Sequence, residues 1–108
     1  IAGLIAIYFI AKNLPSQTIP IKEIDSTYIG KTITTTGRIT SITYNKGHIF
    51  LSIYDGKYID VPIFSNVAKY LTVNLKKGQK ILVRGVVDEY KGKLQIIPRK
   101  ASDIKVLE

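Results

Sequence analysis

The 108-residue sequence contains no cysteine, no methionine and no tryptophan, and it has a single histidine, His48. Without cysteine the chain forms no disulfides and no thiolate metal sites, and a lone histidine excludes a histidine-rich metal site. Acidic residues are scarce as well, with 8 Asp and Glu against 16 Lys and Arg, which gives a formal net charge of +8. A charge excess of this size predicts a polyanionic partner or an anionic membrane surface.

Catalytic patterns are also missing from the sequence. It shows no nucleophile–histidine–carboxylate set, no P-loop and no carboxylate cluster for two-metal chemistry. What is present is a hydrophobic fraction of 45%, enough for one small domain with a core of its own. We therefore predict a binding module rather than an enzyme, and no cofactor.

The first eleven residues carry no charge, and Lys12 ends the run. We predict a helix over residues 1–13 that is the end of a truncated membrane anchor, since a bilayer span takes about 20 residues. Tyr8, Phe9 and Lys12 suit the interfacial end of such a helix. A buried helix and a shortened signal-peptide core are the alternatives.

Two prolines, Pro15 and Pro20, predict a linker over residues 14–20, followed by one domain over residues 21–108. If the anchor is present, the lysine excess of this domain favours the cytoplasmic side of the membrane.

The best functional clue is a predicted ribbon of two strands over residues 47–54 and 57–64. Apolar and polar residues alternate in both halves, so one face is aliphatic and the other carries Phe50, Tyr54 and Tyr58. Asp55-Gly56 between the halves is typical of a type I′ hairpin turn. Exposed aromatic rings with lysines nearby favour binding of single-stranded nucleic acid.

Three further strands are predicted, over residues 31–44, 80–90 and 93–98. The alternation of the first strand slips between Ile39 and Ile42, which indicates a β-bulge, and Gly37 indicates a bend. A helix is predicted over residues 65–72. This element order is that of the OB-fold, an all-β, five-stranded Greek-key barrel with a helix between strands three and four.

The stretches Gly-His-Ile-Phe-Leu-Ser-Ile-Tyr-Asp at residues 47–55 and Ile-Asp-Val-Pro-Ile-Phe at 59–64 resemble anticodon-binding OB domains. The pattern is most similar to the N-terminal OB domain of the exodeoxyribonuclease VII large subunit, which residues 78–87 also match. The resemblance implies that strands two and three, with the loops joining strands one–two and four–five, touch single-stranded nucleic acid. Tyr54 and Asp60 stand where the family often has basic residues. Asp60 is expected to repel phosphate, so we expect weak binding.

Ten residues are candidates for contact with DNA or RNA, as rings that stack on bases or as cations that reach phosphates. They are Arg38, Tyr44, Lys46, Phe50, Tyr54, Lys57, Tyr58, Tyr90, Lys91 and Lys93. For each ring the alternative is cover by a loop or a partner, and for each lysine it is simple solvation. His48 is expected to hold a turn by a hydrogen bond.

Two other functions fit an anchored barrel. An OB domain also serves as a protein-interaction or assembly module, in which case the outer ribbon contacts another chain. The arrangement also resembles the haem chaperone of cytochrome c maturation, but that family attaches haem through a histidine near the end of its barrel. No histidine follows Leu94 here.

Overall fold

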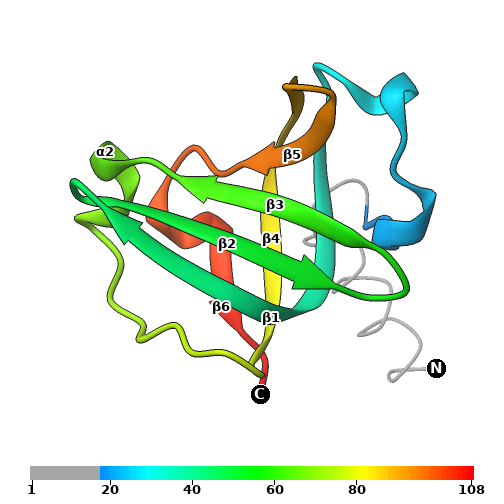
Figure 1. The fold of residues 1–108 in the computed structure, drawn as a ribbon. Helices are drawn as coiled ribbons and strands as arrows, with labels where there is room; N and C mark the ends of the chain where they lie inside the picture. The colour runs from blue at the N-terminus through cyan, green and yellow to red at the C-terminus, as the bar shows by residue number, and fades with distance from the viewer. Residues whose placement is uncertain (1–17) are drawn as a thin grey trace, which may run out of the picture.

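The computed structural model describes residues 18–108, which form a mostly β structure with little helix (Figure 1). The predicted helix over residues 1–13 and the start of the predicted linker lie outside the described residues. Within that linker, Thr18 forms a parallel bridge with Thr34 and Ile19 is buried, so the chain joins the sheet ahead of Pro20. Over residues 18–108, no helix has the length and apolarity that a membrane span requires.

The five predicted strands are present in the predicted order, and a short sixth strand follows them. They are β1 Thr32–Asn45, β2 His48–Tyr54, β3 Tyr58–Ile63, β4 Lys80–Tyr90, β5 Lys93–Ile97 and a short β6 Ile104–Val106. The helix α2, Ser65–Ala68, lies between β3 and β4 as predicted but is shorter than the range 65–72. Beyond it, the N–H groups of Tyr70 and Leu71 bond three residues back, in tighter turns than an α-helix. The structure also has three 3-10 turns, Ile21–Glu23, Ser26–Tyr28 and Ala101–Asp103.

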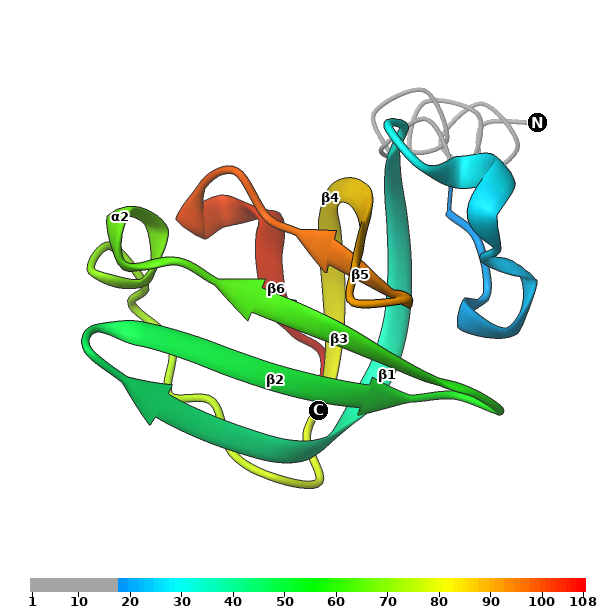
Figure 2. The same cartoon turned by 45° about the horizontal axis from the view of Figure 1, so that its top comes forward.

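Neighbouring strands pair in the order β1–β2–β3–β5–β4, and β4 also pairs with β1. The short β6 pairs with the edge of β4 that is opposite to β1. Among the strands of residues 18–108, β3 and β5 are the one pair that runs parallel, through Asp60 and Gln95. The long β1 pairs with β4 in its first half and with β2 in its second half, and Figure 2 shows the bend between them. The register shifts between Ile39 and Ser41, which confirms the predicted bulge.

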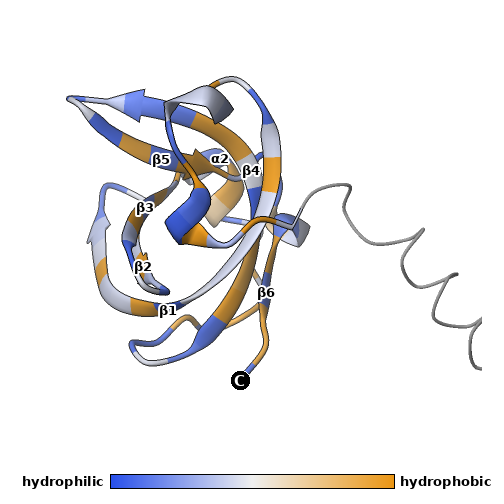
Figure 3. Cartoon of the chain, turned by 90° about the vertical axis from the view of Figure 1, so that its right-hand side faces the viewer, coloured by the Kyte–Doolittle hydropathy of each residue, from blue (hydrophilic) through white to orange (hydrophobic). Residues whose placement is uncertain are grey.

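The core lies between the inner faces of these strands. Figure 3 shows hydrophobic and hydrophilic residues alternating along them. Residues with almost no exposed surface include Ile21, Ile24, Ile33, Ile53, Val61, Ile63, Ile81, Val83 and Ile96. The Ile21 and Ile24 side chains show that the segment ahead of β1 is part of the folded domain.

Two hairpin turns share one design. Lys46 and Gly47 join β1 to β2, Lys91 and Gly92 join β4 to β5, and all four residues have positive φ. Two such residues between paired strand ends make a type I′ turn. The same turn was predicted at Asp55-Gly56, and that prediction is wrong. Three residues separate the paired Tyr54 and Tyr58, and of these only Gly56 has positive φ.

Candidate nucleic-acid interface

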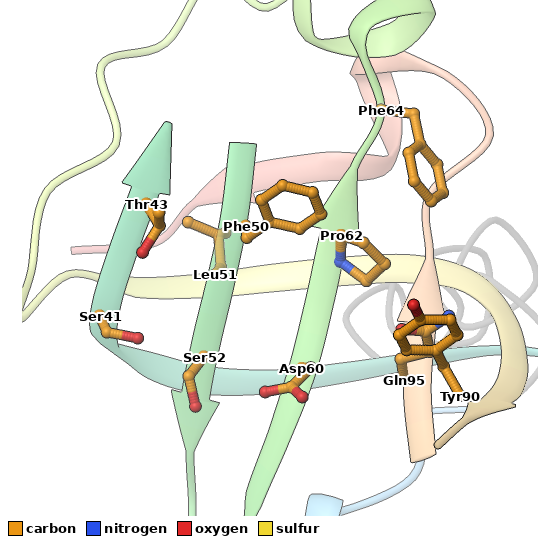
Figure 4. A pocket seen from close by; sticks show the side chains of 10 residues that line it. All are labelled: Ser41, Thr43, Phe50, Leu51, Ser52, Asp60, Pro62, Phe64, Tyr90 and Gln95. Atoms are coloured by element: carbon orange, nitrogen blue, oxygen red, sulfur yellow. The ribbon is translucent and has the colours of Figure 1, made fainter. Parts of the chain in front are cut away.

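A groove of 520 Å³ opens on the outer face of the sheet, across β1, β2, β3 and β5. The rings of Phe50, Phe64 and Tyr90 line it and lie around Pro62 (Figure 4). Their exposed fractions are 36%, 37% and 60%, so each ring keeps accessible surface. The remaining lining residues are Ser41, Thr43, Leu51, Ser52, Asp60 and Gln95. We call this site the aromatic groove.

Strand register explains why these side chains meet. Phe50 stands opposite Pro62 and Ser52 opposite Asp60 in the β2–β3 pair, and residues directly opposite in a pair share a face. With a side-chain period of two, Phe64 continues the outer face of β3 just beyond its last residue. The aliphatic neighbours of these residues turn inward and form the core.

The bulge in β1 extends the aromatic groove. Ile39 is buried, so strict alternation would also turn Ser41 inward. The extra residue at the bulge reverses the alternation, and Ser41 and Thr43 face outward opposite Ser52 and Phe50. The bulge therefore adds two hydroxyl groups to the groove.

His48 supports the groove from its edge. Its Nδ1 accepts a hydrogen bond of 2.9 Å from the backbone N–H of Ser65, at the start of α2. Its ring centroid lies 6.0 Å from that of Phe50 and 5.7 Å from that of Phe64, the latter in an edge-to-face arrangement. The structural hydrogen bond expected of this histidine is present, but it holds the start of α2 rather than the β1–β2 turn.

A second hollow of 530 Å³ continues the groove, because Ser52 and Asp60 line both. Tyr58 and Lys93 line its far side. Tyr58 also packs against Tyr54, with ring centroids 4.7 Å apart. Lys57 lines this hollow too, but its Nζ donates a 2.7 Å hydrogen bond to the Ile24 carbonyl, which ties the hairpin to the segment ahead of β1.

The two lysines of the type I′ turns lie in different surroundings. Lys91 places its Nζ 5.4 Å from the ring centroid of Tyr90, at the edge of the aromatic groove. Lys46 lines a hollow of 560 Å³ together with Tyr44 and Lys69. Tyr44 pairs with Ile49, so it lies on the opposite face of the β1–β2 ribbon from Phe50.

Arg38 is engaged with the end of the chain. Its guanidinium donates to the Gly78 carbonyl at 2.9 Å and to the Glu108 carboxylate at 2.6 Å. These contacts with Arg38 hold the pKa of the Glu108 carboxyl below its ordinary value, so the pair is complete at neutral pH. Because the pKa of this acid is lowered in the folded protein, the pair stabilises the fold at neutral pH. The stabilisation from this exposed pair is small, and it is lost as the pH falls through that pKa.

Of the ten predicted site residues, the structure brings Phe50 and Tyr90 together in the aromatic groove, with Lys91 over the Tyr90 ring. It places Lys57, Tyr58 and Lys93 in the adjoining hollow. Tyr54 and Arg38 line a different hollow beside Lys80, and Tyr44 and Lys46 line another. Sequence reasoning missed the groove residues Ser41, Thr43, Pro62, Phe64 and Gln95. Phe64 lies two residues beyond Pro62, so continuing the outer-face alternation of the predicted strand by one step would have found it. Over residues 18–108, no three His, Asp or Glu side chains gather as metal ligands do.

The family comparison decides the class of the domain. The family model described as an OB-fold nucleic acid binding domain, of the tRNA anticodon type, matches residues 33–104. The chain belongs to this family. Its members are defined by a binding domain, and the matched region runs from β1 to the start of β6.

Solved structures show the same fold. Asparaginyl-tRNA synthetase from Pyrococcus horikoshii matches with a TM-score of 0.66 and 20% identity, over 83% of this chain and 23% of the synthetase. The OB-fold chain spans less than a quarter of that enzyme's length. The OBody AM1L10 bound to hen egg-white lysozyme matches with a TM-score of 0.67 and 20% identity, over 88% of this chain and 97% of the OBody. No curated protein sequence matches this chain.

Proposed function

We propose that this chain is a non-catalytic OB-fold module that binds single-stranded nucleic acid weakly across the outer face of β2 and β3. The aromatic groove carries the proposal, because three exposed rings from separate segments line one 520 Å³ hollow. Stacking of a base on an aromatic ring contributes about 1–3 kcal/mol and tolerates any base. Phe50, Phe64 and Tyr90 are the stacking candidates.

The cations are arranged to meet phosphates at the rim rather than bases in the groove. Lys91 lies over the outer ring, Tyr90, and Lys93 lines the adjoining hollow. Lys46, in the other type I′ turn, lines the separate hollow with Tyr44. Lysines at the rim provide attraction that weakens as salt rises. Asp60 opposes it from the groove floor, so we expect affinity in the micromolar range or poorer.

Two observations bear on whether the ligand is RNA or DNA, and each favours a different one. The family description names the tRNA anticodon, which favours RNA. The likeness of residues 47–64 to the exodeoxyribonuclease VII OB domain favours DNA. A titration of the 108-residue chain with labelled single-stranded DNA and RNA, at several salt concentrations, tests both. Binding of either that falls with salt supports the proposal, and no binding of either at low salt contradicts it.

A protein-interaction module is the second candidate. The OBody structure, a protein of this fold bound to lysozyme, supports it, as do the exposed rings of the groove. If no oligonucleotide binds the chain and the groove residues are protected in a complex with another protein, this second function takes first place.

We further propose that residues 1–13 tether the domain to a membrane, with the domain on the cytoplasmic side. The uncharged run over residues 1–11 and the lysine excess support this. The test is whether the native protein sediments with membranes after a high-salt wash, and whether its domain is digested by protease only after the cells are opened. Release by salt alone contradicts the tether.

A further inference from the structure

Asp60 lies where the two hollows of the outer face meet. Its half-buried side chain lines both the aromatic groove and the hollow beside Tyr58, and Figure 4 shows it on the groove floor. Across the strands it stands opposite Ser52 on one side and Gln95 on the other. From Thr18 to Glu108, no group donates a hydrogen bond to its carboxylate and no cation pairs with it.

An ionised carboxylate only accepts hydrogen bonds, so any ligand group that meets Asp60 must donate. Stacking places the face of a base on a ring and leaves its polar edge free to contact neighbouring strands. On the outer face, Ser52 is the neighbour of Phe50 along β2. Asp60 is the neighbour of Pro62 along β3. A base stacked at Phe50 thus has its edge next to the Asp60 carboxylate, whereas the ring of Tyr90 has Lys91 over it.

The four bases differ in what they present to a carboxylate. Guanine has two adjacent N–H donors, N1–H and the N2 amino group, on its Watson–Crick edge. Adenine and cytosine each have one amino group beside a ring nitrogen that accepts. Uracil and thymine have one N–H between two carbonyl oxygens. Two neighbouring donors suit the two oxygens of one carboxylate, whereas neighbouring acceptors repel them.

Gln95 complements this arrangement. Its side chain lines the same groove from β5, directly beside Asp60. An amide both donates and accepts, and in guanine the O6 acceptor is next to N1–H. A carboxylate and an amide side by side therefore match the donor–donor–acceptor order of the guanine edge.

We propose that Asp60, assisted by Gln95, selects guanine at one position of the bound strand. This inference rests on the proposed function. Asp60 then has two effects: it weakens binding of every sequence through repulsion of phosphates, and it favours guanine at the position it contacts.

The test uses a labelled thymine oligonucleotide of about nine residues, within the range of site sizes known for OB-folds. Variants carry guanine, adenine, cytosine or inosine at the centre. We expect guanine to bind about tenfold more tightly than thymine, the usual size of discrimination by a two-hydrogen-bond contact. Inosine, which lacks only the N2 amino group, should lose most of this gain. 7-Deazaguanine, which changes the opposite edge, should keep it.

Asp60→Asn keeps the shape of the side chain, and Asp55→Asn removes the same charge at the tip of the same hairpin. We expect Asp60→Asn to bring the guanine and thymine oligonucleotides within about twofold of each other while tightening binding of the thymine one. Asp55→Asn should leave the preference unchanged. Equal tightening of all oligonucleotides by Asp60→Asn, or binding by the wild type without base preference, overturns the inference but leaves the proposed function standing. Absence of binding to every oligonucleotide overturns both.

Discussion

The Nδ1 atom of His48 accepts a hydrogen bond of 2.9 Å from the backbone N–H of Ser65, which joins the first residue of β2 to the first residue of α2. The same imidazole contacts the rings of Phe50 and Phe64. Two of the three rings of the aromatic groove therefore rest against one side chain. The lone histidine of the chain acts as a support for the candidate site.

We expect His48→Ala to lower the free energy of unfolding by about 1 kcal/mol or more, because the Ser65 N–H loses its partner. Binding should weaken as well, since Phe50 and Phe64 lose their shared contact. His48→Asn offers an acceptor near the position of Nδ1 and should restore part of the stability but not the ring contacts. Chemical denaturation and oligonucleotide titration measure the two effects, and equal stability of all three proteins would contradict this role.

Replacing Phe50 by alanine should cost about 1–3 kcal/mol of binding free energy, the value of one stacked base. The dependence of affinity on salt should remain nearly unchanged, because no phosphate contact is lost. Tyr70→Ala is the matched control, since Tyr70 is exposed but lines a different hollow with Leu71 and Ile104. Equal losses for Phe50→Ala and Tyr70→Ala would show that the groove has no special part in binding.

Removing the charges of Lys91 and Lys93 should have the reverse effect. Lys91→Asn suits the positive φ of the type I′ turn, and Lys93→Gln keeps a long side chain in β5. The double variant should reduce the slope of log affinity against log salt by about 1 to 2, for every sequence. The same neutral replacements at Lys76 and Lys77, in the loop before β4, should leave the slope unchanged, and a fall there of the same size would rule out a local phosphate contact.

Gly85 is where the fold is most sensitive to an added methyl group. A Cβ at this position would lie 2.5 Å from the Ile97 carbonyl oxygen, a backbone atom of β5. A Cβ at Gly37 would meet the tip of the Ile21 side chain at 2.8 Å, while the nearest backbone atom, the Tyr54 oxygen, is farther away at 3.3 Å. We expect Gly85→Ala to destabilise the protein by about 1–3 kcal/mol or more, and Gly37→Ala by less. Thermal unfolding of both variants checks this order. A larger loss of stability for Gly37→Ala than for Gly85→Ala would contradict the prediction.

Periodicity predicted the parts of the fold that depend on burial. Alternating residues located five of the strands, and the slip between Ile39 and Ile42 located the bulge, because each side chain's face follows from the backbone period. The turn at Asp55-Gly56 could not be predicted from the dipeptide alone. Tyr54 pairs with Tyr58 in the strand register, with their rings packed together, and this pairing leaves three residues in the loop.

The candidate site was predictable only in part. Phe50 was found because it shares a strand with its aliphatic neighbours, but which side Tyr44 takes depends on the bulge, whose position sets every later face of β1. Two relationships join residues far apart in the chain, the Arg38–Glu108 pair and the parallel pairing of Asp60 with Gln95. Local patterns carry no information about such contacts.

The central claim is that single-stranded nucleic acid binds the aromatic groove. The most direct test is to follow the backbone amide NMR signals of the isotopically labelled chain while an unlabelled oligonucleotide is added. We predict that the largest shifts occur at residues 41–43, 50–52, 60–64 and 90–95, the segments that line the groove and its rim. Shifts confined to the hollow around Tyr70, Val73 and Ile104, or no shifts under conditions where the oligonucleotide is in large excess, would contradict the claim.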